Sequence, residues 1–169
     1  MKKTTVLLVL LCLVLLSGCM SDGTGNVFLK KDFSAPIGRY TAAVVTMDTG
    51  NYPQSIADAE TFRTYLVSML GKYAVFNDIV SAEDAKGMKN VVLLKCEMAE
   101  YNKIDEITRF MVGSMAGTSS VKVDIELRDF KTKESLGVVE TSGTTPQAMI
   151  RAIETAADLA AQKLSGLKQ

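Results

Sequence analysis

Apolar and charged residues alternate most regularly over residues 121–128, where a β-strand with one buried and one solvent-exposed face is predicted. Residues 136–142 form a second β-rich segment after a polar turn, so the two segments predict an antiparallel hairpin. Two longer apolar segments, 40–47 and 91–101, also predict strands, and 73–76 is a short strand candidate. The chain is therefore expected to contain four or five strands.

Two other segments repeat their apolar residues every three or four positions, as one buried face of a helix requires. The first spans residues 55–70, and Gly71 is predicted to end it, because glycine adopts a left-handed conformation without steric cost. The second begins with Thr145 as its cap and Pro146 in its first turn, and it continues to Ser165. Its many alanines predict a close approach to a sheet.

The order of these elements predicts an α+β fold. Two amphipathic helices on one face of a four- or five-stranded sheet, mixed or mostly antiparallel, form a two-layer sandwich that buries the apolar faces. The length and even composition of the chain predict a single such domain, over residues 37–169.

The first residues follow a different pattern from the rest of the chain. Lys2 and Lys3 are followed by an unbroken apolar run over residues 6–16, which is too short to span a bilayer and is typical of a signal peptide. Residues 16–19, Leu-Ser-Gly-Cys, then resemble the lipobox of bacterial lipoproteins, in which two small residues precede the cysteine that receives lipid.

This resemblance implies a signal peptide over residues 1–18, cleavage between Gly18 and Cys19, and a diacylglyceryl group on the Cys19 thiol. It also implies acylation of the new amino terminus, and two or three acyl chains hold a protein firmly at a membrane. In bacteria with two membranes, a residue other than Asp after the cysteine, here Met20, is typical of lipoproteins sorted to the outer membrane. We therefore expect a domain that faces the periplasm from the outer membrane, with the inner membrane or the cell surface as alternatives.

Residues 19–36 are expected to form a lipidated, flexible tether. Residues 21–26 are small, polar and glycine-rich, as in flexible linkers. Residues 27–29, Val-Phe-Leu, interrupt this polarity. They predict either an extended arm that lies on the domain or a contact with a partner.

The composition argues against several classes of function. Loss of Lys2 and Lys3 leaves 17 basic and 19 acidic side chains, without the dense basic face that nucleic acid requires. The absence of His removes the commonest metal ligand and the usual proton shuttle at neutral pH. No phosphate-binding loop, zinc-ligand spacing or nucleophile motif is present. We expect no enzymatic activity, no catalytic residue, no cofactor, no metal and no nucleic acid.

Two residues nevertheless have a reactive side chain in a suggestive position. Cys96 lies on the apolar face of its predicted strand, so it is expected to be a core residue, with pairing to another chain as the alternative. Asp48-Thr49-Gly50 resembles the signature of aspartic proteases, but those enzymes need two such aspartates. A strand that ends in a turn explains the same residues.

Residues 107–117 precede the alternating strand and combine apolar residues with an arginine and three glycines or alanines near their end. With the hairpin that follows, they resemble a family of bacterial lipoproteins that carry a domain of unknown function, numbered forty-four ten. The resemblance extends from about Tyr40 to Leu164. The residues that carry it are Arg109, Gly113, Gly117, Val121, Val123, Ile125, Asp129 and Leu136.

The same segment contains the candidate interaction residues of the domain. Gly113 and Gly117 have the spacing of a membrane-helix contact, but the apolar stretch is far too short to span, and a tight bend that brings backbone against backbone is favoured. Arg109 is expected either to bind an anionic group near that bend or to satisfy carbonyl or carboxylate groups of its own chain.

These observations favour a non-enzymatic envelope lipoprotein. The lipid on Cys19 would locate it, and the domain would bind an envelope protein or act in assembly, as small periplasmic lipoprotein domains of similar layout do. The sheet edge and the bend over residues 109–117 are the candidate contact surfaces. The alternative is a periplasmic module that binds a small molecule or lipid between the helices and the sheet.

Overall fold

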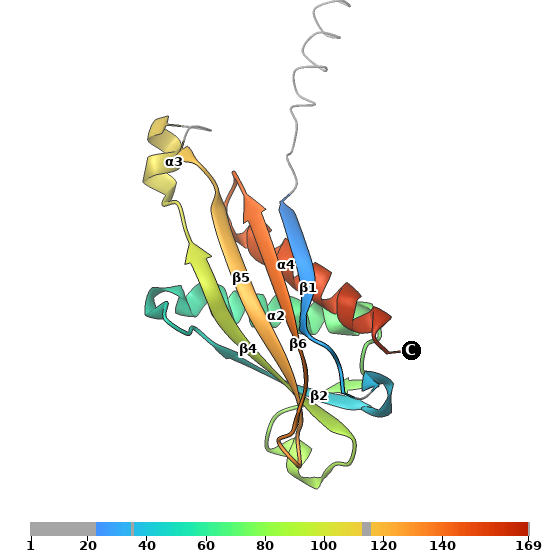
Figure 1. Ribbon diagram of the computed structural model, residues 1–169. Coiled ribbons are helices and arrows are strands. Elements are labelled where there is room, and N and C mark those ends of the chain that lie inside the picture. Colours follow the sequence, from blue (N-terminus) through green and yellow to red (C-terminus); the bar gives the residue numbers. More distant parts are fainter. Residues whose placement is uncertain (1–22, 35, 113–115, 169) are drawn as a thin grey trace, which may run out of the picture.

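The computed structural model describes residues 23–34, 36–112 and 116–168, and it shows a mixed sheet of six strands in the order β1-β6-β5-β4-β2-β3 (Figure 1). Strand β2 runs parallel to β3 and β4, and the other neighbours are antiparallel. The strands are β1 (Thr24–Lys31), β2 (Ala42–Asp48), β3 (Asp78–Ile79), β4 (Val91–Asn102), β5 (Ser119–Asp129) and β6 (Ser135–Thr145).

Two long helices, α2 (Ile56–Lys72) and α4 (Met149–Gly166), cover one face of this sheet (Figure 1). Their apolar stripes meet every second residue of the strands, as the alternation in β5 predicts, and together they form the main core. The expected two-layer α+β arrangement is therefore observed, but the sheet has six strands instead of the predicted four or five, and a short third helix, Glu106–Val112, is added. The largest fully buried side chains include Phe62, Leu66, Leu94, Met98, Ile125, Leu127 and Ile153.

The opposite face of the sheet has no long helix over it. Near β2 it carries a small apolar cluster that includes Ala42, Val44 and Val91, covered by the short 3-10 helix Asp84–Gly87. Farther along β4 and β5 the same face is charged, because every second residue of these strands is acidic or basic.

Helix α4 lies close to β6, as its alanine content predicts. A Cβ atom built on Gly143 would lie 1.9 Å from the carbonyl oxygen of Ala152, so the two backbones leave no room for a side chain. The Thr141 hydroxyl donates a buried hydrogen bond to the carbonyl of Ala156 at 2.7 Å. Small residues on both elements therefore set the distance between the helix and the sheet.

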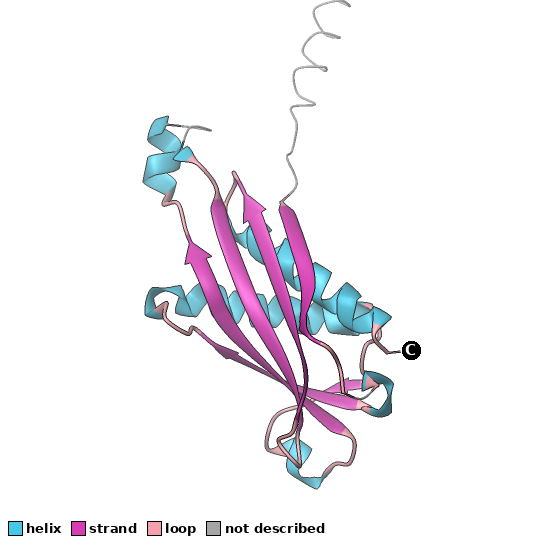
Figure 2. Ribbon diagram, in the orientation of Figure 1, coloured by secondary structure: helices cyan, strands magenta, loops and turns pink. Residues whose placement is uncertain are grey.

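The main correction to the expected fold concerns the tether. Residues 24–31 belong to strand β1 rather than to a flexible tether over 19–36, and they pair with β6 from Thr24 opposite Thr144 onward (Figure 2). Val27 and Leu29 pack against the main core, so the extended arm is the correct alternative for this segment. The glycine-rich composition concealed the strand, because β1 is held through its backbone and only a few side chains. The domain therefore begins before residue 37.

A second correction concerns the end of α2. Residues 73–76 were predicted as a strand, but they form the turn after α2, and the short strand is β3. Gly71 lies inside the helix, and Ala74 adopts the left-handed conformation instead, with φ of +48°. The N–H of Ala74 donates to the carbonyl of Gly71 at 3.1 Å, as in the common left-handed helix ends.

The last helix also starts later than predicted. Strand β6 continues to Thr145, and α4 begins at Met149. The Thr145 hydroxyl accepts the backbone N–H of Gln147 at 3.0 Å, so it closes the turn before the helix and does not cap the helix itself.

The close approach of α4 to β6 makes Gly143 sensitive to substitution. We expect Gly143→Ala to lower the free energy of unfolding by about 3 kcal/mol, the upper end of the usual cost of overpacking, because the added methyl group meets backbone rather than a movable side chain. Gly71→Ala is the matched control, since a Cβ there meets nothing within 4 Å. It should raise stability by about 0.5–1 kcal/mol, because alanine is favoured over glycine inside a helix. Urea unfolding of both variants measures this, and equal stabilities would contradict the packing account.

Candidate interaction surfaces

A short helix, α3 (Glu106–Val112), lies beyond the end of the sheet between β4 and β5 (Figure 1). Asp105 begins it: one carboxylate oxygen accepts the backbone N–H of Thr108 at 2.8 Å and the other accepts its hydroxyl at 2.5 Å. The Thr108 hydroxyl bond, together with the backbone bond, lowers the pKa of the Asp105 carboxyl. This cap explains why so short a segment is helical.

Arg109 fastens α3 to the rest of the domain. Its Nη1 donates to the carbonyl of Pro146 at 2.8 Å, and its Nη2 donates to the hydroxyl of Ser119 at 2.5 Å. Ser119 is fully buried, and its hydroxyl also accepts the N–H of Ile104 at 3.1 Å. Of the two roles expected for Arg109, the structure therefore shows the one in which it satisfies groups of its own chain.

The apolar residues of α3 point away from the domain. Ile107, Phe110 and Met111 are 74%, 91% and 77% exposed, and they share one helix face by their spacing. Val112 beside them is also exposed. An amphipathic helix normally buries this face and exposes its charges, but here the arginine faces inward. We call Ile107, Phe110, Met111 and Val112 the α3 apolar surface.

Gly117 follows the helix and has a φ of +91°, a conformation that favours glycine. A Cβ built on it meets no atom of the described residues within 4 Å, and the expected contact of backbone against backbone at this bend stays a prediction. Gly117 shapes the bend through its φ angle. Gly113, like Gly18 and Cys19, lies outside the described residues.

The strand registers place the start of β1 at the same end of the sheet as α3. Thr24 lies opposite Thr144, Thr144 lies opposite Ser120, and Ser120 lies opposite Asn102, the last residue of β4. One row across the sheet therefore joins the first residue of β1 to the two strand ends that hold α3. The first residue of β1 therefore lies at the α3 end of the domain.

Strand β1 forms one free edge of the sheet. It pairs with β6 on one side and with no described strand on the other. Phe28 projects from it onto the face without helices and is 56% exposed. A free edge of eight residues presents unpaired backbone groups that can bind a further strand. This is the sheet edge that the sequence suggested as a contact, now assigned to a particular strand.

The open face next to β1 carries a row of acids. Asp48, Glu97, Asp124 and Glu140 lie opposite one another across β2, β4, β5 and β6, an arrangement that is repulsive when uncompensated. Lys30 of β1 partly neutralises it, with Nζ 2.6 Å from Asp124 and 3.3 Å from Glu140. The hydrogen bond with Asp124 raises the pKa of Lys30. The charge on β1 therefore helps to hold it on the sheet.

The two reactive residues singled out in the sequence have local roles. The Asp48 carboxylate accepts the N–H of Gly50 at 3.0 Å, and Gly50 has a φ of +55°, so these residues form a turn after β2. Cys96 is fully buried in the core, and this burial raises the pKa of its thiol to about 12. A thiol in that state is neutral and inaccessible near neutral pH.

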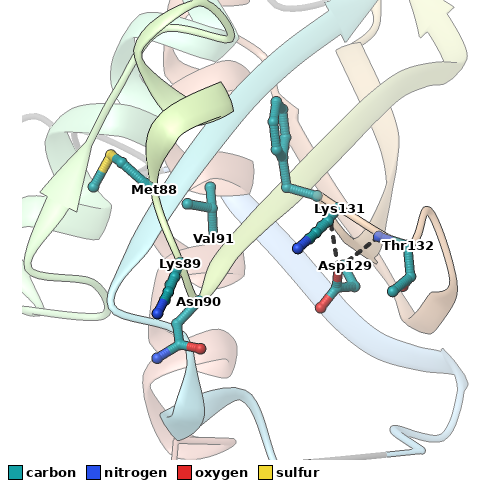
Figure 3. Close-up of a pocket in the computed structure, with 8 residues that line it drawn as sticks. Met88, Lys89, Asn90, Val91, Asp129, Lys131 and Thr132 are labelled. Atoms are coloured by element: carbon teal, nitrogen blue, oxygen red, sulfur yellow. Dashed lines mark hydrogen bonds between the residues drawn. The ribbon is translucent and has the colours of Figure 1, made fainter.

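A pocket of about 280 Å³ lies at the end of the sheet opposite α3, between the start of β4 and the β5–β6 turn (Figure 3). Its carboxylate, Asp129, is bonded to its own chain. One oxygen accepts the N–H groups of Lys131 and Thr132 at 2.9 Å each, and the other accepts the Tyr40 hydroxyl at 3.0 Å. The Thr132 backbone bond contributes most to the lowered pKa of Asp129. The pocket is thus built around a turn.

The α3 apolar surface is the feature that the sequence analysis missed. The arginine and glycines of residues 107–117 predicted a bend. The cap at Asp105 and the helical spacing of Ile107, Phe110 and Met111, which indicate a helix, were missed. The spacing alone would have predicted an amphipathic helix with a buried apolar face. Only the bonds of Arg109 show that this face is turned outward. Among the described residues, no helix is long and apolar enough to cross a membrane.

Removal of the Arg109 side chain should loosen the end of the domain. We expect Arg109→Ala to lower the free energy of unfolding by about 1–3 kcal/mol, because it removes two donors and leaves the buried Ser119 hydroxyl with one partner fewer. Amide hydrogen exchange should quicken in α3 more than in α2. Arg151→Ala is the control, because that exposed arginine pairs only within α4. Equal effects of the two variants would refute the fastening role.

Cys96 should not react in the folded protein. With its thiol pKa raised to about 12 by burial, we expect iodoacetamide at pH 8 to modify Cys96 only after unfolding in urea. Mass spectrometry of the native and unfolded chain measures this. Rapid modification of the native protein would show that the core opens at β4.

The fold of this chain is similar to that of known protein structures. Two solved structures share the fold: the PelC dodecamer from Paraburkholderia phytofirmans, with a TM-score of 0.57, and a single-residue variant of the same dodecamer, with a TM-score of 0.53. Each is 15% identical in sequence and aligns with 86% of this chain and 100% of the other. At that identity the likeness shows the fold alone. A search of curated proteins found no significant match.

The family model described as "Domain of unknown function (DUF4410)" matches residues 42–148, from β2 to the residue before α4. This range holds the α3 end of the domain, including Arg109 and Gly117, and the whole β5–β6 hairpin. It confirms the resemblance to the domain numbered forty-four ten, and the chain therefore belongs to the DUF4410 family.

Proposed function

We propose that the protein is a membrane-anchored lipoprotein of the bacterial envelope, with a non-enzymatic role in assembly. Residues 1–18 act as the signal peptide, and Cys19 carries the lipid. The domain faces the periplasm, with the outer membrane as its location because Met20 follows the cysteine. The order of positive charge, apolar run, small residues and cysteine supports this anchoring.

The free edge of β1 carries the proposal of an assembly role. An edge of eight residues, with Phe28 exposed beside it, is a surface on which a second protein can add a strand and bury an aromatic ring. Sheets without such a role usually shorten or cover their edges. The opposite edge follows that rule, because β3 has only two residues.

The likeness to PelC supports the same role. The PelC structures are of a dodecamer, and this chain shares their fold over 86% of its length. We propose that copies of this chain, or this chain and another envelope protein, associate through the β1 edge. A heterologous contact of this kind closes into a ring when its rotation permits.

The alternative, a module that binds a small molecule or lipid, has less support. It needs an apolar pocket in which free polar groups converge. The pocket at the far end of the sheet has a volume of about 280 Å³, and Asp129 within it is bonded to its own turn. Two larger hollows, of about 670 Å³ beside Tyr101 and about 420 Å³ beside Tyr65, are more open to solvent and are lined mainly by polar and charged residues. We therefore prefer assembly.

The anchor is tested by intact mass spectrometry of protein extracted from membranes, beside a Cys19→Ser variant. We expect the unaltered protein to lack residues 1–18 and to carry acyl mass, and the variant to carry none. A soluble, unmodified protein would refute the lipoprotein proposal.

The assembly role is tested on the same extracted protein by crosslinking and by its mass in solution. We expect an assembly larger than one chain, or a co-purified envelope protein. Phe28→Gln should weaken it at least about tenfold, or about 1.4 kcal/mol, since the exposed ring is lost from the contact. Phe110→Gln is the matched control and should leave the assembly intact. A monomer without partners would refute the role.

A further inference from the structure

We propose that the α3 apolar surface is a second membrane contact, seated in the interface of the bilayer beside the lipid on Cys19. The inference rests on the proposed anchoring, which supplies the membrane. It adds that the α3 end of the domain is the end that contacts the bilayer.

The strand registers bring the two contacts together. Cys19 precedes Thr24 by five residues, so the lipid attachment lies within about 18 Å of the start of β1 even if the chain is fully extended. Strands β1 and β4 are three strand spacings apart, or about 14 Å, in the order β1-β6-β5-β4. Helix α3 begins just after β4 at the same end, so one membrane surface can meet both the lipid and the helix (Figure 1).

The chemistry of α3 suits the bilayer interface. Phe110 and Met111 are exposed over most of their surface, and Ile107 shares their face. An interfacial helix places such a face about 5–10 Å deep, at the boundary of headgroups and acyl chains. With seven residues, α3 lies along the interface and does not span it.

Electrostatic attraction is not required for this contact. Arg109 is engaged by Pro146 and Ser119, and Lys103 near the helix pairs with Asp58 at 2.9 Å. These two cations are therefore already bonded within the domain. We infer that the helix enters neutral bilayers and that added salt has little effect.

A lipid anchor favours the bilayer over a second copy as the occupant of this surface. Because only five residues separate Cys19 from Thr24, a lipid on Cys19 would keep α3 near the membrane and give the membrane contact a high effective concentration. A second copy would instead have to meet this surface by diffusion. The β1 edge stays free for protein contacts.

Two contacts would fix the orientation of the domain. With the lipid and α3 in the membrane, the sheet stands away from the surface along its strands. Strand β5 has 11 residues, so the β5–β6 turn would lie about 35 Å from the bilayer.

The test uses lipidated protein that has passed the mass analysis, reconstituted in phosphatidylcholine vesicles. Phe110→Cys is labelled with an environment-sensitive fluorophore, and Met88→Cys is the matched control, from an exposed apolar residue at the opposite end of the sheet. Cys96 is fully buried, so the new cysteine is the accessible thiol of the described residues. Lipids that carry a nitroxide near the headgroup quench the label on contact. Thermal unfolding of both labelled proteins checks that they are folded.

We expect blue-shifted emission and severalfold stronger lipid quenching at residue 110 than at residue 88, unchanged by 0.5 M salt. Equal, weak quenching at the two positions would overturn the inference while leaving the anchor established. If the emission at residue 110 shifts with the number of proteins per vesicle but is not quenched by lipid, a second copy occupies the surface. That result would also overturn the inference. Absence of lipid on Cys19 refutes the anchoring proposal before this test begins.

Discussion

Helix α4 packs closely against the sheet because alanine, glycine and threonine line the contact. This close packing determines the positions of the neighbouring strands. At Gly143 the helix backbone occupies the space of a side chain, and Thr141 donates a buried hydrogen bond into the helix. Alanines on the inner face of α4 are fully buried. The helix also packs against β1, where a Cβ built on Gly25 would lie 2.9 Å from Thr155 and 2.8 Å from Leu159.

This packing makes β1 part of the domain. The position of β1 in turn determines from which end of the domain the chain leads back to Cys19. Val27 and Leu29 reach the core, and Lys30 neutralises part of the acidic row on the open face. The strand ends its pairing at Thr24, level with the ends of β4 and β5. A lipid on Cys19 would therefore be attached close to the α3 end of the domain rather than through a long, flexible tether.

The α3 end shows how a few hydrogen bonds can reverse the usual arrangement of a helix. The guanidinium of Arg109 is directed inward by the carbonyl of Pro146 and by the buried Ser119 hydroxyl. The helix spacing then turns Phe110 and Met111 to the outside. The two ends of the sheet differ accordingly: one is apolar and close to the first residue of β1, and the other is a polar turn organised by Asp129.

Periodicity in the sequence was sufficient for the elements that pack through their side chains. It predicted β5, the hairpin with β6 and the apolar faces of α2 and α4, because each pattern reflects burial against a single neighbour. The resemblance carried by residues of the α3 segment and the hairpin predicted the family. The tertiary structure alone decided the rest. Strand β1 is held largely by backbone pairing, which leaves little trace in side chains, and Ala74 takes a left-handed conformation that composition assigns to Gly71. The exposed face of α3 depends on Ser119 and Pro146, residues distant in sequence, so no local pattern specified it.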